Sequence, residues 1–271
     1  NFRHVACAKQ LKDGACRNRH CIGSETCPNL DTSHDDYVKL LREIRSVKGV
    51  KKVFVRSGLR YDYVLADHNK AFVKELCQYH VSGQLKVAPE HVVKHVTDLM
   101  GKADVQAFLK FKDWFDEANR ELGKKQYLVP YFMSSHPGCT LKDAVALAEF
   151  LLDMHMQPEQ VQDFIPTPGS LSTAMYYTGL NPLTGEKVYV ARRPEEKQMQ
   201  RALMQYKNPA NYDIVYKALC LAGRRDLIGY GPKCLIAPRR HQAGRRPDKA
   251  GRPAAPSCRQ GRGPAKTRKF R

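Results

Sequence analysis

The chain has 271 residues, 42% of them hydrophobic, and a formal net charge of +19. This length and apolar content are enough for one large α/β domain or two modest ones. Its nine cysteines are too few and too scattered for a secreted disulfide scaffold. No apolar run approaches the roughly 20 residues of a membrane span, and the N-terminus has no signal pattern. We therefore expect a cytoplasmic protein with no membrane partner and, because it begins at Asn1, a piece of a longer chain.

The chain opens with a cysteine-rich loop in which Cys7, Cys16, Cys21 and Cys27 follow the spacing C-x8-C-x4-C-x5-C. Thiolates close together in a short polar loop are ligands that zinc and iron–sulfur clusters select. The spacing, however, matches none of the common zinc fingers. Two interpretations stay open: an auxiliary zinc or cluster site formed by these four cysteines, and scattered cysteines that hold no metal.

Helix and strand signals then alternate along the chain. In chain order we predict a helix between residues 31 and 49, a strand over 52–56, a helix over 70–79, a strand over 84–88, a helix over 105–123, a strand over 127–133, a helix over 140–152 and a strand over 160–165. The helix over 140–152 has a start signal, Thr140 followed three residues later by Asp143.

The four predicted strands recur at the spacing of βα units. Their landmarks, Val53, Lys86, Leu128 and Gln162, are 33, 42 and 34 residues apart. Four such units in series favour a parallel sheet or a partial barrel, whose chemistry gathers at the carboxyl ends of the strands.

The pattern changes after Ser170. We predict a Tyr-rich loop over residues 175–182, a short strand or extended segment over 188–191, and two helices over 195–206 and 210–221 that form a small helical C-terminal appendix. Residues 238–271 carry twelve Lys or Arg and one acid, which places +11 of the net charge there. With almost no apolar residues, this basic tail is expected to be disordered. The predicted domains are therefore residues 1–170, 171–237 and 238–271.

Several motifs resemble one known family. They are LKVAPEH (residues 85–91), YLVPYFMSSHPG (127–138), QDFIPTPGSLSTAMYYTGLNP (162–182) and VRSGLRYD (55–62), together with the Cys7 to Cys27 segment that leads into Pro28 and Asp31. In this order they resemble the C-terminal half of the YgiQ-type radical S-adenosylmethionine (radical SAM) proteins, over roughly residues 1–237.

The resemblance implies an α/β fold, a partial parallel (β/α) barrel of the radical SAM type that is incomplete here. It also implies a [4Fe–4S] cluster held by a C-x3-C-x2-C loop, an electron donor such as flavodoxin or ferredoxin, and cleavage of S-adenosylmethionine to a 5′-deoxyadenosyl radical that attacks a substrate, here unknown. The C-x3-C-x2-C motif is absent from this sequence. The chain should therefore carry the later part of the barrel, with the primary cluster outside it, and be inactive alone.

The resemblance also assigns residues to S-adenosylmethionine. Lys86 and Glu90 would contact its ribose, amino or carboxylate groups, since a zwitterion needs partners of both signs. Ser134, Ser135 and His136 would lie on the same rim, and the segment from Phe164 to Thr167 would line the adenine. Structural roles remain as alternatives: Lys86 could extend along the barrel wall to solvent, and His136 could hold the turn before Pro137.

Two other functions compete with this reading. The basic arm over residues 239–271 could neutralise RNA phosphates in an RNA-binding or RNA-modifying protein. Because Phe270 is its only aromatic residue, that binding would be non-specific. The Cys7 to Cys27 loop could instead make the chain a metal-stabilised interaction module.

Overall fold

The computed structural model describes residues 6–14, 16, 20–67, 69–158 and 161–239. The chain divides into one unit of residues 1–238 and a second of residues 239–271. All helices and strands that the structure describes lie in the first unit. The basic tail predicted to be disordered covers residues 238–271, and those after Arg239 lie outside the described residues.

A three-stranded parallel sheet organises this unit. Its strands are β1 (Gln84–Glu90), β2 (Tyr127–Ser134) and β3 (Gln162–Asp163), in the order β1-β2-β3. β1 and β2 pair from Gln84 opposite Tyr127, and β2 and β3 pair at Met133 opposite Gln162 and at Ser134 opposite Asp163. The α/β class and the parallel strands predicted from the sequence are therefore confirmed.

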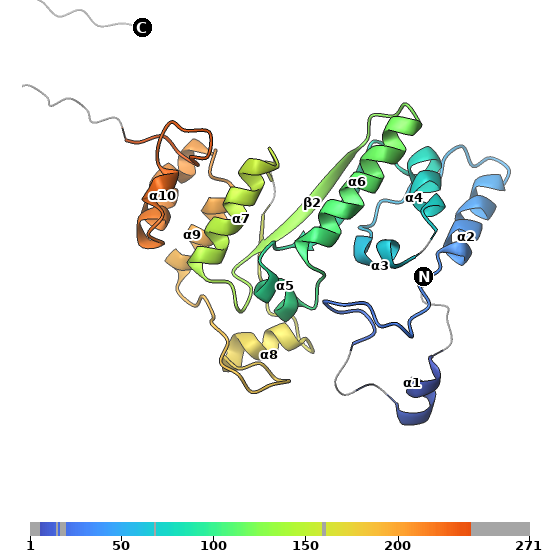
Figure 1. Cartoon of the computed structure of the whole chain (residues 1–271), viewed down its shortest axis with the longest axis horizontal. Helices are drawn as coiled ribbons and strands as arrows, with labels where there is room; N and C mark the ends of the chain where they lie inside the picture. Colours follow the sequence, from blue (N-terminus) through green and yellow to red (C-terminus); the bar gives the residue numbers. More distant parts are fainter. Residues whose placement is uncertain (1–5, 15, 17–19, 68, 159–160, 240–271) are drawn as a thin grey trace, which may run out of the picture. The chain divides into compact units, whose positions relative to one another are not determined.

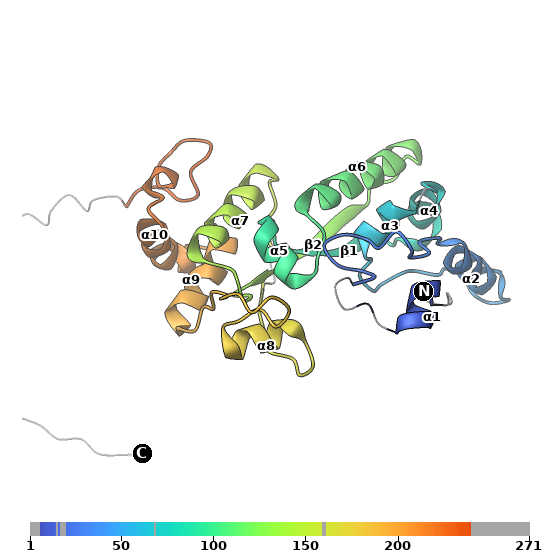
Figure 2. The ribbon, with the colours of Figure 1, turned by 60° about the horizontal axis from the view of Figure 1, so that its bottom comes forward.

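Helices pack against this sheet and leave part of it uncovered (Figures 1 and 2). The α-helices are α1 (Ala8–Asp13), α2 (Asp35–Ser46), α3 (Tyr61–Ala66), α4 (Ala71–Glu75), α5 (Lys94–Met100), α6 (Val105–Glu121), α7 (Leu141–Asp153), α8 (Leu171–Thr178), α9 (Pro194–Met204) and α10 (Tyr212–Leu221). A π-helix, η1 (Leu76–His80), continues α4, and the 3-10 turns η2 (Pro209–Asn211) and η3 (Arg225–Leu227) flank α10. Among the described helices none has the length and apolar character needed to cross a membrane.

The core consists of two main clusters on either side of β2 in Figure 1. In one, Leu85 and Val87 of β1 pack with α3, α4 and the phenylalanines of α6. In the other, α9 packs against both α7 and α10. Lys86 alternates with two fully buried neighbours and is exposed, as expected for a strand with one covered face.

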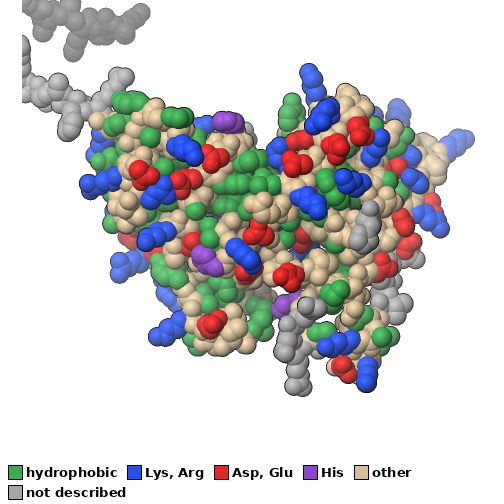
Figure 3. Space-filling model, viewed as in Figure 1, with side chains coloured by type: hydrophobic (Ala, Val, Ile, Leu, Met, Phe, Trp, Pro, Cys, Tyr) green, Lys and Arg blue, Asp and Glu red, His purple; other side chains and the backbone are tan. Residues whose placement is uncertain are grey.

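Charges of both signs cover the outside of this unit. On the face drawn in Figure 3, Lys and Arg side chains are interspersed with Asp and Glu. Several form ion pairs, for example Arg42 with Glu75 at 2.9 Å and Lys74 with Glu121 at 2.8 Å. An exposed pair such as Lys74 with Glu121 contributes little to stability.

Three of the sequence predictions need correction. Residues 52–56 form no regular strand, because the segment joins its neighbours only at single points such as Val55 N–H to the His80 carbonyl (2.9 Å). The strand over 160–165 reduces to two paired residues before Pro166. Residues 188–191, expected as a short strand or an extended segment, form no regular strand, although Leu180 and Lys187 form an isolated bridge just before them.

The third correction concerns the predicted Tyr-rich loop, the first half of which belongs to helix α8. Ser170 caps its start, since the Ser170 side chain accepts the Thr173 N–H, and Gly179 ends it in the left-handed conformation at φ 69°. Three helices, α1, α3 and α5, also form where none was predicted. The helices predicted over 31–49, 105–123, 140–152, 195–206 and 210–221 are confirmed within a few residues.

Candidate functional site

The carboxyl ends of β1 and β2 both depart from regular strand geometry. Val87 is opposite Pro130 and Glu90 is opposite Phe132, so β1 has one extra residue there. Pro89 lies in this bulge, where its missing N–H costs no ladder bond. Glu90 follows at φ 66°, and Ser135, one residue beyond β2, has φ 62°. Non-glycine residues in this left-handed region are uncommon and cluster at functional sites.

A cavity of about 390 Å³ opens at these strand ends, and we call it the rim cavity. Four of the residues expected to contact a cofactor line it: Glu90, His136, Phe164 and Thr167. They come from the ends of β1 and β2 and from the segment after β3, which meet because parallel strands end at the same edge of a sheet. The volume is in the usual range for small-molecule sites.

The rim cavity contains a pair of opposite charges. Lys102 Nζ lies 3.4 Å from Glu90 Oε1, and both side chains are partly exposed. Lys102 comes from the segment after α5, and sequence reasoning had assigned no role to it. The cavity therefore offers a carboxylate and an ammonium side by side.

His136 forms the inner wall of the rim cavity. Its Nδ1 lies 2.7 Å from the Pro137 carbonyl oxygen, and its Nε2 lies 2.8 Å from Ser172 Oγ. The Phe164 ring meets the imidazole edge-on at 5.1 Å between centroids. Burial lowers the pKa of His136 to about 4, although the hydrogen bond to the Pro137 carbonyl acts in the opposite direction. The ring is therefore neutral at physiological pH.

Ser134 and Ser135 are buried beside the rim cavity, and their polar groups bond to side chains that do not line it. The Ser134 hydroxyl bonds the Asp163 carboxylate, which also pairs with Arg201 of α9. The Ser135 N–H donates to Gln200 Oε1 at 3.0 Å, and Gln200 Nε2 donates to the Cys139 carbonyl at 3.0 Å. These contacts make the two serines supports of the rim.

Next to them a second buried histidine links β1 to the turn after β2. His91 Nδ1 accepts the Val93 N–H at 3.1 Å, and its Nε2 lies 3.5 Å from Cys139 Sγ. Burial lowers the pKa of His91 to about 4 and raises that of the Cys139 thiol, so both groups are uncharged at physiological pH. Because each of these neutral, buried polar groups has a partner, the pair stabilises the rim.

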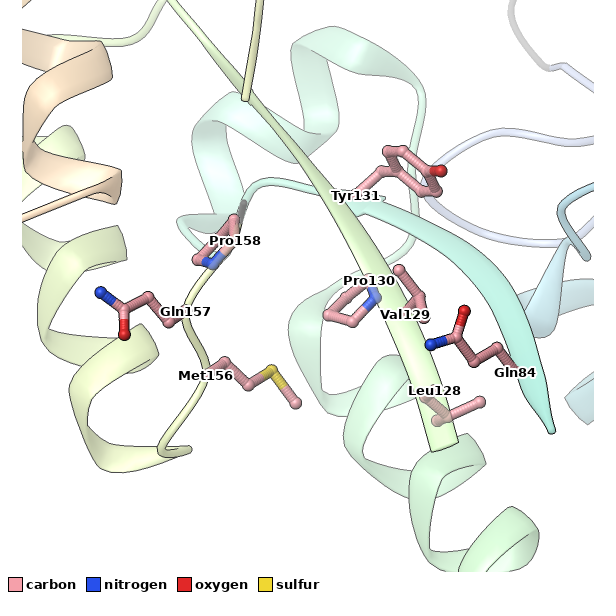
Figure 4. A pocket seen from close by; sticks show the side chains of 8 residues that line it. All are labelled: Gln84, Leu128, Val129, Pro130, Tyr131, Met156, Gln157 and Pro158. Atoms are coloured by element: carbon pink, nitrogen blue, oxygen red, sulfur yellow. The ribbon is translucent and has the colours of Figure 1, made fainter. Parts of the chain in front are cut away.

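Lys86 lies on a different part of the sheet. Its Nζ is 5.7 Å from the centre of the Tyr131 ring, and the side chain is exposed. Tyr131 borders a second hollow of about 370 Å³, the open-face cavity, lined by Gln84, residues 128–131 of β2 and residues 156–158 after α7 (Figure 4). Lys86 is thus not among the residues that line the rim cavity, and Lys102 supplies the positive charge there.

Of the four N-terminal cysteines, Cys21 and Cys27 are brought together by backbone contacts. The Cys27 N–H donates to the Cys21 carbonyl at 3.1 Å, and Ile22 forms an antiparallel bridge with Thr26. Arg60 donates to the carbonyl oxygens of Gly23 (3.4 Å) and Gly101 (3.3 Å) and so ties this turn to the residue before Lys102. Across the described ranges, no three His, Cys, Asp or Glu side chains, with Cys7 and Cys16 among those searched, gather closely enough to hold a metal ion.

Comparison with known proteins gives this chain a family context. Residues 159–270 match the model described as Domain of unknown function (DUF3362). A UPF0313 protein, CPE1196, of Clostridium perfringens (strain 13 / Type A) is 59% identical over 236 residues, which are 87% of this chain and 36% of that protein.

Similar values hold for other UPF0313 proteins. That of Methanocella arvoryzae is 55% identical over 86% of this chain and 39% of the relative, and CLJ_B0249 of Clostridium botulinum (strain 657 / Type Ba4) is 54% identical over 87% and 37%. Homologues of this chain are therefore UPF0313 proteins, and the chain spans little more than a third of the length of these relatives.

Proposed function

We propose, from this relationship to UPF0313 proteins and from the rim cavity, that the chain forms the later part of a radical SAM (β/α) barrel and that the rim cavity binds S-adenosylmethionine. One observation carries the proposal. At the carboxyl ends of parallel strands, the Glu90 carboxylate and the Lys102 ammonium lie 3.4 Å apart in a cavity that Phe164 also lines.

These residues fit the cofactor chemically. S-adenosylmethionine has an ammonium and a carboxylate at its amino-acid end and an adenine at the other. Glu90 would hold the ammonium, Lys102 would hold the carboxylate, and the Phe164 ring would offer an apolar wall to the adenine. The chemistry supplied by the bound cofactor in this class is hydrogen abstraction through a 5′-deoxyadenosyl radical.

The protein's own contribution is to place and support these groups. The bulge at Pro89 turns the backbone so that Glu90 reaches the cavity, and Gln200 holds Ser135 in its left-handed conformation next to His136. A rigid supporting layer of this kind keeps a bound ligand in one orientation.

The described residues do not fit the primary iron–sulfur cluster, since no suitable group of ligands gathers among them. The segments that UPF0313 relatives have beyond the matched region would have to supply the cluster ligands.

The full gene product tests this proposal after anaerobic reconstitution with iron and sulfide. We expect iron–sulfur absorption and, after reduction with S-adenosylmethionine present, release of 5′-deoxyadenosine detected by mass spectrometry. Failure to bind a cluster under these conditions would remove the radical SAM assignment.

A second candidate function, a metal-stabilised interaction module, has one observation in its favour. The turn that joins Cys21 to Cys27 places two thiol-bearing residues at its base. Metal analysis of this chain separates the alternatives: zinc would indicate a structural site, and iron with sulfide an auxiliary cluster. Loss of the metal in C21S but not in C220S would assign it to the N-terminal loop, and a metal-free chain would remove the site.

A further inference from the structure

We propose that Ser172 is a recognition point that selects for a hydrogen-bond donor, a hydroxyl or an amino group, on the ligand in the rim cavity. The inference rests on the proposed function, because a nucleoside cofactor carries such groups on its ribose and on its adenine. It adds a residue of α8, within the segment that matches DUF3362, to the binding surface.

The direction of the hydrogen bond between Ser172 and His136 follows from the atoms around the imidazole. The Pro137 carbonyl oxygen, 2.7 Å from Nδ1, can only accept a hydrogen bond, so Nδ1 carries the proton. A neutral imidazole has a single N–H, so Nε2 is an acceptor. The Ser172 hydroxyl, 2.8 Å from Nε2, therefore donates to it.

The surroundings keep this arrangement fixed. His136 is buried, which favours the neutral ring at physiological pH, and the Phe164 ring packs against it. Only a protonated imidazole would reverse the bond and free the serine proton. Around neutral pH the proton of Ser172 is thus always directed at His136.

A hydroxyl with its one proton engaged can act only as an acceptor towards other groups. Ser172 lines the rim cavity and is partly exposed, so its lone pairs are accessible to a ligand. A ligand carbonyl or carboxylate placed there would meet a second acceptor, which costs binding free energy, whereas an O–H or N–H would gain a bond.

The neighbouring residue Thr173 provides a matched control. Its hydroxyl donates to the Thr167 carbonyl at 2.6 Å, and Thr173 is not among the residues that line the cavity. Replacing Thr173 by the isosteric valine removes a hydroxyl from the same helix and keeps the Ser172 hydroxyl, so it measures what the loss of its bonds to Thr167 and Ser170 of the wall does by itself.

The experiment compares adenosine with analogues that each lack one donor: 2′-deoxyadenosine, 3′-deoxyadenosine and purine riboside, which lacks the 6-amino group. Ligand-detected NMR, which reaches millimolar dissociation constants, measures each compound against the wild-type full gene product and against S172A, S172T and T173V. The analogue that loses affinity identifies whether the ribose or the adenine supplies the donor.

We expect one analogue to bind the wild type about five-fold more weakly than adenosine, the value of one neutral hydrogen bond. S172A should bind that analogue and adenosine equally, whereas S172T and T173V should keep the difference. Equal discrimination in the wild type and S172A, or none in the wild type, would overturn the role of Ser172 and leave the proposed function intact. If S-adenosylmethionine binds the wild type but no nucleoside does, the role of Ser172 falls alone; if neither binds, the proposed function falls and the inference falls with it.

Discussion

Replacing Gln200 by leucine should destabilise the whole unit, because this side chain satisfies two buried backbone groups far from it in sequence. Gln200 has no solvent exposure, accepts the Ser135 N–H at 3.0 Å and donates to the Cys139 carbonyl at 3.0 Å. Leucine fills a similar volume but pairs with neither group.

The expected magnitude follows from these two contacts. Each buried polar group left without a partner costs about 1–3 kcal/mol, and the added apolar side chain recovers part of that loss. We therefore expect Q200L to lower the free energy of unfolding by about 2–4 kcal/mol. The left-handed conformation of Ser135 adds to the effect, since the lost hydrogen bond helps to hold it.

Equilibrium unfolding in urea, followed by circular dichroism, measures this difference if the slopes of the transitions agree. Gln198 lies on the same helix and is exposed, so Q198L is the matched control and should change stability by no more than about 0.5 kcal/mol. If Q200L were as stable as Q198L, the contacts of Gln200 would not support the rim as described.

Three further predictions concern the rim and its supports. E90Q should weaken the binding of S-adenosylmethionine, measured by calorimetry, about ten-fold, because a charge-assisted bond is lost. The exposed control E121Q should bind it as the wild type does. Equal affinities of E90Q and the wild type would exclude Glu90 from the site. T140A should lower the free energy of unfolding in urea by about 1 kcal/mol, since Thr140 and Asp143 cap α7 reciprocally. An unchanged midpoint of the transition would contradict this. Folding lowers the pKa of His91 and of His136 to about 4, whereas the pKa in the unfolded chain is about 6.5. Between these values the unfolded chain binds more protons than the folded one. The free energy of unfolding should therefore be fully retained above pH 6.5 and fall towards pH 4 by up to about 1.4 kcal/mol per pH unit for each histidine. Urea unfolding from pH 7 to 5 checks this, and a slope in H91Q as steep as in the wild type would contradict the assignment to His91.

The parts of the fold that sequence reasoning predicted are those with local signals. Thr140 and Asp143 form the capping box expected at the start of α7, and the apolar spacing of α6 places its phenylalanines in the core. Helix α8 was missed although Ser170 and Gly179 mark its ends. Its tyrosines and threonines are weak helix formers, and the nearby Pro and Gly residues favour a loop.

The site was less predictable, because its contacts join residues far apart in the chain. Glu90 was expected at the rim, but its ion pair with Lys102 depends on where the segment after α5 returns to the sheet. Gln200 reaches Ser135 from 65 residues away, and Ser172 reaches His136 from 36. No local pattern encodes such pairs, which form only after the core has assembled.

The most direct test of the central proposal is to locate S-adenosylmethionine on the protein by photolabelling with its 8-azido analogue and to map the labelled peptides by mass spectrometry. We predict that the label enters the segment from Phe164 to Ser172 and that excess S-adenosylmethionine prevents it. Protected label at residues 128–131 or 156–158 would instead place the cofactor in the open-face cavity, and labelling that S-adenosylmethionine does not prevent would contradict a cofactor site in this chain.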